Sequence, residues 1–200
     1  MNLKISGILK KIAELEHELE IALVTEVEEK QKAFRYRVEK EKVTFEEEIR
    51  GIQRKMRKNV LTFLAETPLT SLLVAPIIYS LYIPLVFLDL WLWAYQASCF
   101  KAYGIPRVKR SEYVVLDRGG LQYLNWIEQL NCNYCGYANG LMAYAREVAS
   151  KTEQYFCPIK HARKVLGVHG RYRRFFDFGD AESYQKELER LRNELRKPGS

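Results

Sequence analysis

The chain has 200 residues, of which 28% are charged and 48% hydrophobic, and this composition excludes an intrinsically disordered chain. The length suffices for one domain of ordinary size with extensions. The formal net charge of +7 points to an anionic partner, either phospholipid headgroups or nucleic acid, and the placement of the charge has to decide between them.

The N-terminal stretch MNLKISGILKKIAELEHELE interrupts every helical turn with charge and lacks the apolar core of a signal peptide. We therefore expect the N-terminus to stay in the cytosol. Four cysteines are too few for a secreted disulfide scaffold. In a reducing compartment, clustered thiols favour metal binding or redox chemistry over structural bridges.

Residues 1–59 are predicted to form a long, charged amphipathic helix. No proline occurs between residues 3 and 59, and apolar side chains recur at spacings of three, four and seven from Ile5 to Met56. Such a helix cannot bury its apolar stripe alone. We therefore expect a coiled coil or a helical hairpin, with self-association or a protein partner along this helix.

Residues 60–99 are predicted to enter a membrane. Residues 69–97 contain one charged side chain, Asp89, and exceed the roughly 20 residues that a bilayer span needs. Basic residues flank this run on both sides, and Pro76 and Pro84 interrupt it. These features favour a re-entrant or interfacial hairpin that bends near Pro84, with both ends in the cytosol.

Two alternatives to the hairpin remain, namely one tilted span and a buried core helix. Trp91 and Trp93 suit the depth of the headgroups in either membrane arrangement. A carboxylate in lipid is costly, so Asp89 is expected to mark the return to the interface or to pair with a nearby tyrosine.

Residues 100–196 are predicted to form a small helical domain, with a flexible tail at 197–200. Helical patterns cover residues 121–131, 141–156 and 181–196, and Asp180 is a suitable N-cap for the last of them. Pro158 is expected to open a further short helix with Cys157 at its cap position. Glycines and asparagines between residues 136 and 140 predict a break before residue 141.

Three of the four cysteines and a histidine form the pattern C-x2-C-x21-C-x3-H, made of Cys132, Cys135, Cys157 and His161. A Cys3His set is a closed, structural zinc combination, and thiolates also hold iron–sulfur clusters. Ligands one helical turn apart face the same way. The sequence therefore predicts a metal site, with zinc favoured over an iron–sulfur cluster.

Geometry limits this prediction. A straight helix over residues 141–156 would be about 24 Å long and would carry Cys157 away from Cys135. One ion could then be shared only if the glycine-rich stretch runs back along the helix or the helix bends. Otherwise the two pairs belong to different chains or different ions. The simpler alternatives are buried cysteines with a surface His161, or a nucleophile–base pair of Cys157 and His161.

Residues 160–174, KHARKVLGVHGRYRR, contain six cations and no acid, which predicts contact with phosphate. The cations are Lys160, Arg163, Lys164, Arg171, Arg173 and Arg174. Anionic membrane lipids are the leading partner because an apolar segment precedes this loop. Nucleic acid ranks behind them, since no recognised nucleic-acid-binding motif is present. A solvated basic loop is the simplest alternative.

The stretches YLNWIEQLNCNYCGYANG, TEQYFCPIKHARK and FGDAESYQKEL resemble parts of bacterial membrane-associated proteins that combine a hydrophobic segment with this cysteine motif. The likeness covers about residues 70 to 192. It implies a bacterial, inner-membrane setting and no particular activity.

The sequence as a whole predicts a mainly α protein with a long N-terminal helix, an apolar membrane segment and a small metal-binding domain. Its expected role is interaction or scaffolding at the cytosolic face of the inner membrane, with a structural metal. One alternative is a metal-dependent enzyme or iron–sulfur electron carrier acting on a lipid-like substrate. A second is a nucleic-acid-binding protein. No catalytic constellation stands out, so an enzyme is the less favoured class.

Overall fold

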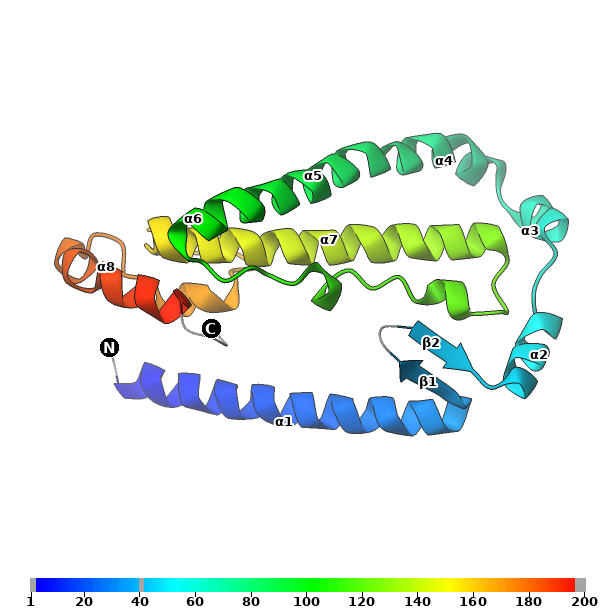
Figure 1. Cartoon of the computed structure of the whole chain (residues 1–200), viewed down its shortest axis with the longest axis horizontal. Coiled ribbons are helices and arrows are strands. Elements are labelled where there is room, and N and C mark those ends of the chain that lie inside the picture. The colour runs from blue at the N-terminus through cyan, green and yellow to red at the C-terminus, as the bar shows by residue number, and fades with distance from the viewer. Residues whose placement is uncertain (1–2, 40–41, 197–200) are drawn as a thin grey trace. The chain divides into compact units, whose positions relative to one another are not determined.

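The computed structural model describes residues 3–39 and 42–196 and is mainly helical, as predicted (Figure 1). The chain divides into two units, one made of residues 1–63 and 117–129 and the other of residues 64–116 and 130–200. This division differs from the predicted boundaries at residues 59 and 99. The apolar segment packs with the C-terminal half and shares its core.

The first unit begins with a long helix that is shorter than predicted. Its elements are α1 (Leu3–Phe34), β1 (Tyr36–Glu39), β2 (Lys42–Phe45) and α2 (Glu47–Lys55). The helix ends where Arg35 adopts a left-handed backbone conformation with φ of 52°. The Arg35 guanidinium pairs with Glu46 and with Glu48, the latter at 2.8 Å, which holds the turn into the hairpin.

The antiparallel hairpin β1–β2 replaces the predicted continuation of the helix. Its strands pair Tyr36 with Phe45 and Val38 with Val43. Aromatic and β-branched side chains favour strands, and here they match across the two strands. The helical spacing of the same residues was a weaker signal than this pairing. The hairpin, the end of α1 and residues 117–123 line an apolar groove of about 460 Å³.

The apolar stripe of α1 has no partner within the described part of its unit. Leu15, Leu19 and Leu23 are each more than half exposed. The coiled coil stays a prediction, because the described residues of this unit leave the stripe of α1 exposed.

The second unit contains the apolar segment as a nearly continuous helix. Its elements are α3 (Val60–Glu66), which joins the units, α4 (Leu69–Ser80), α5 (Tyr82–Tyr95), a π-helical turn (Gln96–Phe100) and α6 (Lys101–Tyr103). Within the described residues, the run Leu69–Tyr103 is the one helix that is long and apolar enough to cross a membrane.

The predicted hairpin with its bend at Pro84 is not formed. Leu81, between α4 and α5, keeps helical backbone angles of −62° and −18°, so the chain passes straight through. Pro84 lies in the first turn of α5, where a missing N–H costs least. Pro76 lies inside α4 without breaking it. The buried-core alternative is also wrong, because 6% of the most apolar stretch is buried.

The core of the second unit lies between α5 and α7 (Trp126–Phe156), with α8 (Ala181–Arg196) closing one end (Figure 1). Leu85, Phe100, Leu141, Val148 and Leu195 are among its buried side chains. The predicted break before residue 141 is absent. Gly140 instead lies inside α7, where the backbone of residues 113–114 crosses so closely that a Cβ would lie 2.5 Å from the Tyr113 carbonyl oxygen.

Candidate functional site

The four predicted metal ligands are not brought together by one chain. Cys132 and Cys135 lie in α7, and Cys157 follows the end of the same helix. The 21 residues between Cys135 and Cys157 rise about 30 Å along a continuous helix, so the two pairs cannot share an ion in this fold. Across residues 3–39 and 42–196, no group of three or more His, Cys, Asp or Glu side chains could hold a metal ion.

The region after α7 is extended, so the predicted short helix at Pro158 is not formed. Ile159 and Phe176 form a parallel bridge, with Lys160 N–H donating to the Phe176 carbonyl and Phe176 N–H to the Pro158 carbonyl, each at 2.8 Å. His161 is exposed, and its ring Nδ1 lies 3.1 Å from the Tyr172 hydroxyl. The ring of His161 stacks on Tyr172, with ring centroids 5.9 Å apart.

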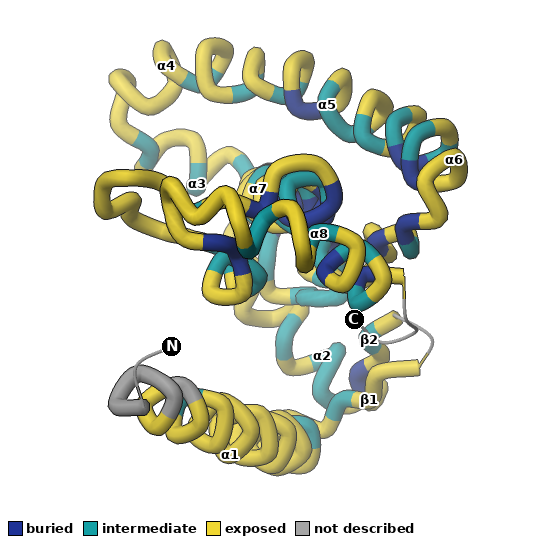
Figure 2. The backbone as a smooth tube through the Cα atoms, turned by 90° about the vertical axis from the view of Figure 1, so that its left-hand side faces the viewer, coloured by how far each residue is buried: buried dark blue, intermediate teal, exposed yellow. Residues whose placement is uncertain are grey.

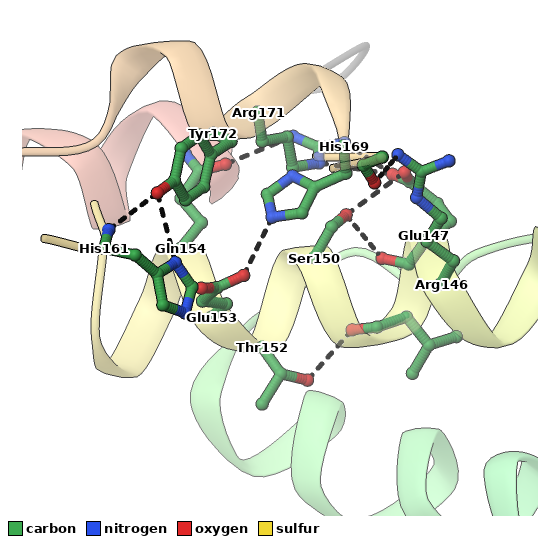
Figure 3. Close-up of polar contacts among 12 residues, drawn as sticks. Arg146, Glu147, Ser150, Thr152, Glu153, Gln154, His161, His169, Arg171 and Tyr172 are labelled. Carbon is green, nitrogen blue, oxygen red and sulfur yellow. Dashed lines mark hydrogen bonds and ion pairs between the residues drawn. The ribbon is translucent and has the colours of Figure 1, made fainter. Parts of the chain in front are cut away.

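Polar contacts fasten the loop of residues 157–180 onto the last turns of α7 (Figure 3). Arg171 donates to Glu147 at 2.7 and 3.2 Å and to the Gln154 side chain at 3.3 Å. Arg146 donates to the Gly167 carbonyl at 2.8 Å. These contacts give Arg171 a structural role.

His169 joins the same cluster from the loop. Its Nε2 lies 2.8 Å from a Glu153 carboxylate oxygen, while its buried Nδ1 has no hydrogen-bond partner (Figure 3). The ring also packs edge-on against Tyr172 and Phe175. The histidine therefore anchors the loop through one nitrogen and its aromatic faces.

The six cations predicted to bind anions divide into two groups. Arg171 forms an ion pair with Glu147, and Lys160 forms one with Asp177, each at 2.7 Å. The remaining four are exposed on the loop, namely Arg163, Lys164, Arg173 and Arg174. Contact of the exposed cations with an anionic surface stays a prediction.

Asp89 in the apolar segment is the centre of a polar network. Its carboxylate accepts from Arg110 at 2.7 to 3.0 Å and from the Tyr137 hydroxyl at 3.0 Å. The tyrosine partner was one of two expectations for Asp89. The arginine was not foreseen, because it lies 21 residues further along in an irregular segment. Burial, followed by the hydrogen bond to Asp89, raises the pKa of Tyr137 above its ordinary value of 10.0.

A second polar contact, at the start of the π-helical turn that follows α5, was also missed. The buried Gln96 accepts from the Val108 N–H at 2.7 Å and donates to the Tyr144 hydroxyl. A glutamine at the end of a long apolar run was the available signal, since a polar side chain in such a place needs a buried partner.

The side of α4 and α5 away from α7 is apolar and open. Its large side chains are between 64% and 76% exposed at Ile77, Ile83, Phe87 and Trp91. Trp93 is likewise exposed, and its predicted place at the depth of the headgroups stays a prediction. This apolar face is a candidate binding surface of the second unit.

Comparison of the chain with protein-family models, curated proteins and solved structures finds no match, so the assignment of function depends on these side chains alone.

Proposed function

We propose that the chain is a membrane-associated interaction or scaffold protein at the cytosolic face of the bacterial inner membrane. The observation that carries this proposal is the apolar helix Leu69–Tyr103, whose most apolar 18-residue stretch has a mean hydropathy of 2.1 and is 6% buried. Exposed apolar surface of this extent is typical of a membrane or protein interface.

The scaffold part of the proposal depends on α1. A helix with an exposed leucine stripe and charged flanks favours pairing with a second helix, either of another copy or of a different protein. The exposed loop cations would add attraction to anionic headgroups, worth about 1 kcal/mol per charge near the surface.

The metal prediction stays separate from this function. Zinc, or an iron–sulfur cluster, at Cys132, Cys135, Cys157 and His161 would need ligands from two chains or a different conformation, because α7 separates the pairs. We therefore assign the metal no role in membrane association.

Flotation of the purified chain with vesicles of phosphatidylethanolamine and phosphatidylglycerol tests the proposal. The chain should float with vesicles, and Phe87→Glu with Trp91→Glu should abolish flotation. Met142→Glu, exposed on α7, is the matched control and should float like the unaltered chain. A chain that stays at the bottom of the gradient with these vesicles would refute membrane association.

A further inference from the structure

We infer that α4 and α5 lie in the plane of the membrane, with one face in the lipid and α7 on the water side, instead of crossing the bilayer. This inference builds on the proposed membrane association and specifies the surface and the orientation by which it occurs.

The apolar helix has two unlike sides. One side is covered, at Tyr82, Leu85 and Leu92, by packing against the core that α7 supplies. The opposite side carries Ile77 and Phe87 and faces away from α7, as the exposed outer edge of α4 and α5 shows in Figure 2. A helix that crosses a bilayer in contact with lipid on all sides needs no such division.

A crossing would also place charge in hydrocarbon. A span needs about 20 residues, and every such stretch that starts at or after residue 70 of Leu69–Tyr103 contains Asp89. Its partner Arg110 is 45% exposed and Asp89 itself 15%, so the ion pair is open to its surroundings on the arginine side. Charged side chains at that depth are costly unless they face a protein interior or a water-filled cavity.

The stretch that avoids Asp89, residues 69–88, meets a different obstacle. Tyr79 donates to Asn131 of α7, and the Tyr134 hydroxyl donates to the Ile78 carbonyl at 2.9 Å. The exposed Asn131 and the first turns of α7 would therefore enter the hydrocarbon with this stretch.

Irregular backbone accompanies the other end of α5. Residues 105–114 contact Gln96 through Val108, Asp89 through Arg110 and α7 at Gly140. Lipid-exposed irregular backbone does not occur at membrane depth, since its N–H and C=O groups would lack partners. An in-plane helix avoids this cost, because its apolar face enters about 5–10 Å and the rest stays wet.

The chemistry around the face fits a phospholipid surface in particular. Trp91 stacks with Phe87 on the exposed side, and tryptophan is enriched at headgroup depth. Lys101, Arg107 and Lys109 are exposed where the helix ends, which places positive charge beside the apolar face. In this orientation both flanks of the segment remain in the cytosol without any reversal of the chain.

Depth measurements by spin labelling test the orientation. Reporter cysteines replace Leu73, Ile77, Ile83 or Phe87 in a chain whose four native cysteines are serine, with flotation and helical content checked for each variant. In-plane insertion predicts one shallow depth for all four nitroxides, from power saturation with oxygen and a water-soluble nickel chelate. A crossing helix would instead rise about 1.5 Å per residue, so depth would change steadily with position.

A second measurement determines on which side of the membrane the chain lies. In intact bacterial cells, an impermeant thiol reagent added outside should label none of these reporters, nor one placed at Leu166. Depth that varies steadily through the bilayer, or labelling from outside at one end, would overturn the in-plane orientation while membrane association stands. Loss of flotation by the unaltered chain would overturn the proposed function and this inference with it.

Discussion

Single residues decide how tightly the irregular segment 105–114 can approach α7. Gly140 accommodates the backbone of Tyr113 and Val114, and Lys151 donates to the Pro106 carbonyl at 3.1 Å. The contact at Gly140 requires a residue without a side chain, and the contact at Lys151 requires a buried amino group. Both positions lie on α7 and hold the same segment, so each can be tested alone.

Gly140→Ala should destabilise the chain by about 1–3 kcal/mol, the usual cost of overpacking. The new Cβ would meet backbone atoms at 2.5 and 3.0 Å, and backbone cannot rotate away as a side chain can. Thermal unfolding followed by circular dichroism measures the change. Gly51→Ala is the control, because α2 leaves open space there and the change should gain about 0.5–1 kcal/mol. Equal melting temperatures of the two variants would contradict the close approach of residues 113–114 to Gly140.

Lys151 should make stability rise with pH in the alkaline range. Burial, with Arg171 adding to it, lowers the pKa of Lys151 below its ordinary value of 10.5. Between the lowered pKa and 10.5, the unfolded chain binds a proton that the folded chain has released, so the free energy of unfolding increases with pH. Lys151→Met removes this effect.

The measurement for Lys151 is the difference in unfolding midpoint between the unaltered chain and Lys151→Met, followed from neutral to alkaline pH. The unfolding midpoint of the unaltered chain should rise relative to that of the variant as the pH increases. Burial raises the pKa of Tyr144 and opposes the trend, but it is common to both proteins. Parallel pH curves would show that folding does not lower the pKa of Lys151.

The cysteines permit a test of the metal prediction against the structure. Because α7 separates Cys135 from Cys157 by about 30 Å, Cys157→Ser should leave the metal content of the purified chain unchanged, whatever Cys132→Ser does. Elemental analysis of protein purified without added metal gives the result. Equal loss of metal in both variants would instead require a shared site, within a rearranged chain or between two chains.

At the scale of elements, the loop of residues 157–180 depends on α7 for its place. Arg171, with 17% of its side chain exposed, joins Glu147 and Gln154, while His169 reaches Glu153. The loop carries the exposed cations, so its attachment decides where they are presented. Its composition predicted a headgroup-binding role for all six cations, but two of them serve the fold.

Arg171→Ala should cost about 2 kcal/mol, because it leaves the carboxylate of Glu147 without its charged partner. Limited proteolysis should then cut between residues 157 and 180 faster, and the unfolding midpoint should fall. Arg174→Ala alters an exposed cation on the same loop and should change stability by less than about 0.5 kcal/mol. Similar proteolysis of the two variants would argue against the anchoring role.

At the scale of the whole molecule, the described residues expose both the apolar face of α4 and α5 and the stripe of α1. Each belongs to a different unit. The first suits lipid because it is broad and continuous, with tryptophan and cations beside it. The second suits another helix, because its leucines form a narrow line between charged flanks.

Self-association through α1 should be lost in the double variant Leu15→Ser and Leu19→Ser. Both side chains are more than half exposed on the stripe, so their removal should leave the fold of a single chain intact. Sedimentation velocity in mild detergent should find the unaltered chain as an oligomer and the variant as a monomer. His17→Ser, about half a turn from the stripe, should stay oligomeric. A monomeric unaltered chain would contradict self-association, and the stripe of α1 would then be expected to bind a different protein.

The sequence by itself determined the helical class, the apolar run of residues 69–97 and α8 with its N-cap. Each depends on local pattern: α8 spans the predicted residues 181–196, and the Asp180 carboxylate accepts from the Ser183 N–H at 3.0 Å. The resemblance to bacterial membrane-associated proteins and the proposed metal stay predictions. The sequence located the cation-rich loop, but it did not predict the ion pairs of Lys160 with Asp177 and of Arg171 with Glu147.

Tertiary structure decided whatever depends on where a helix continues or stops. Gly136 and Gly140 suggested a break by their conformational freedom, yet the crossing of residues 113–114 requires a small residue inside a continuous α7. That continuity separates the cysteine pairs, and the packing of α5 on α7 turns a potential span into a helix with one covered side. Such contacts join residues far apart in the chain, and local spacing carries no information about them.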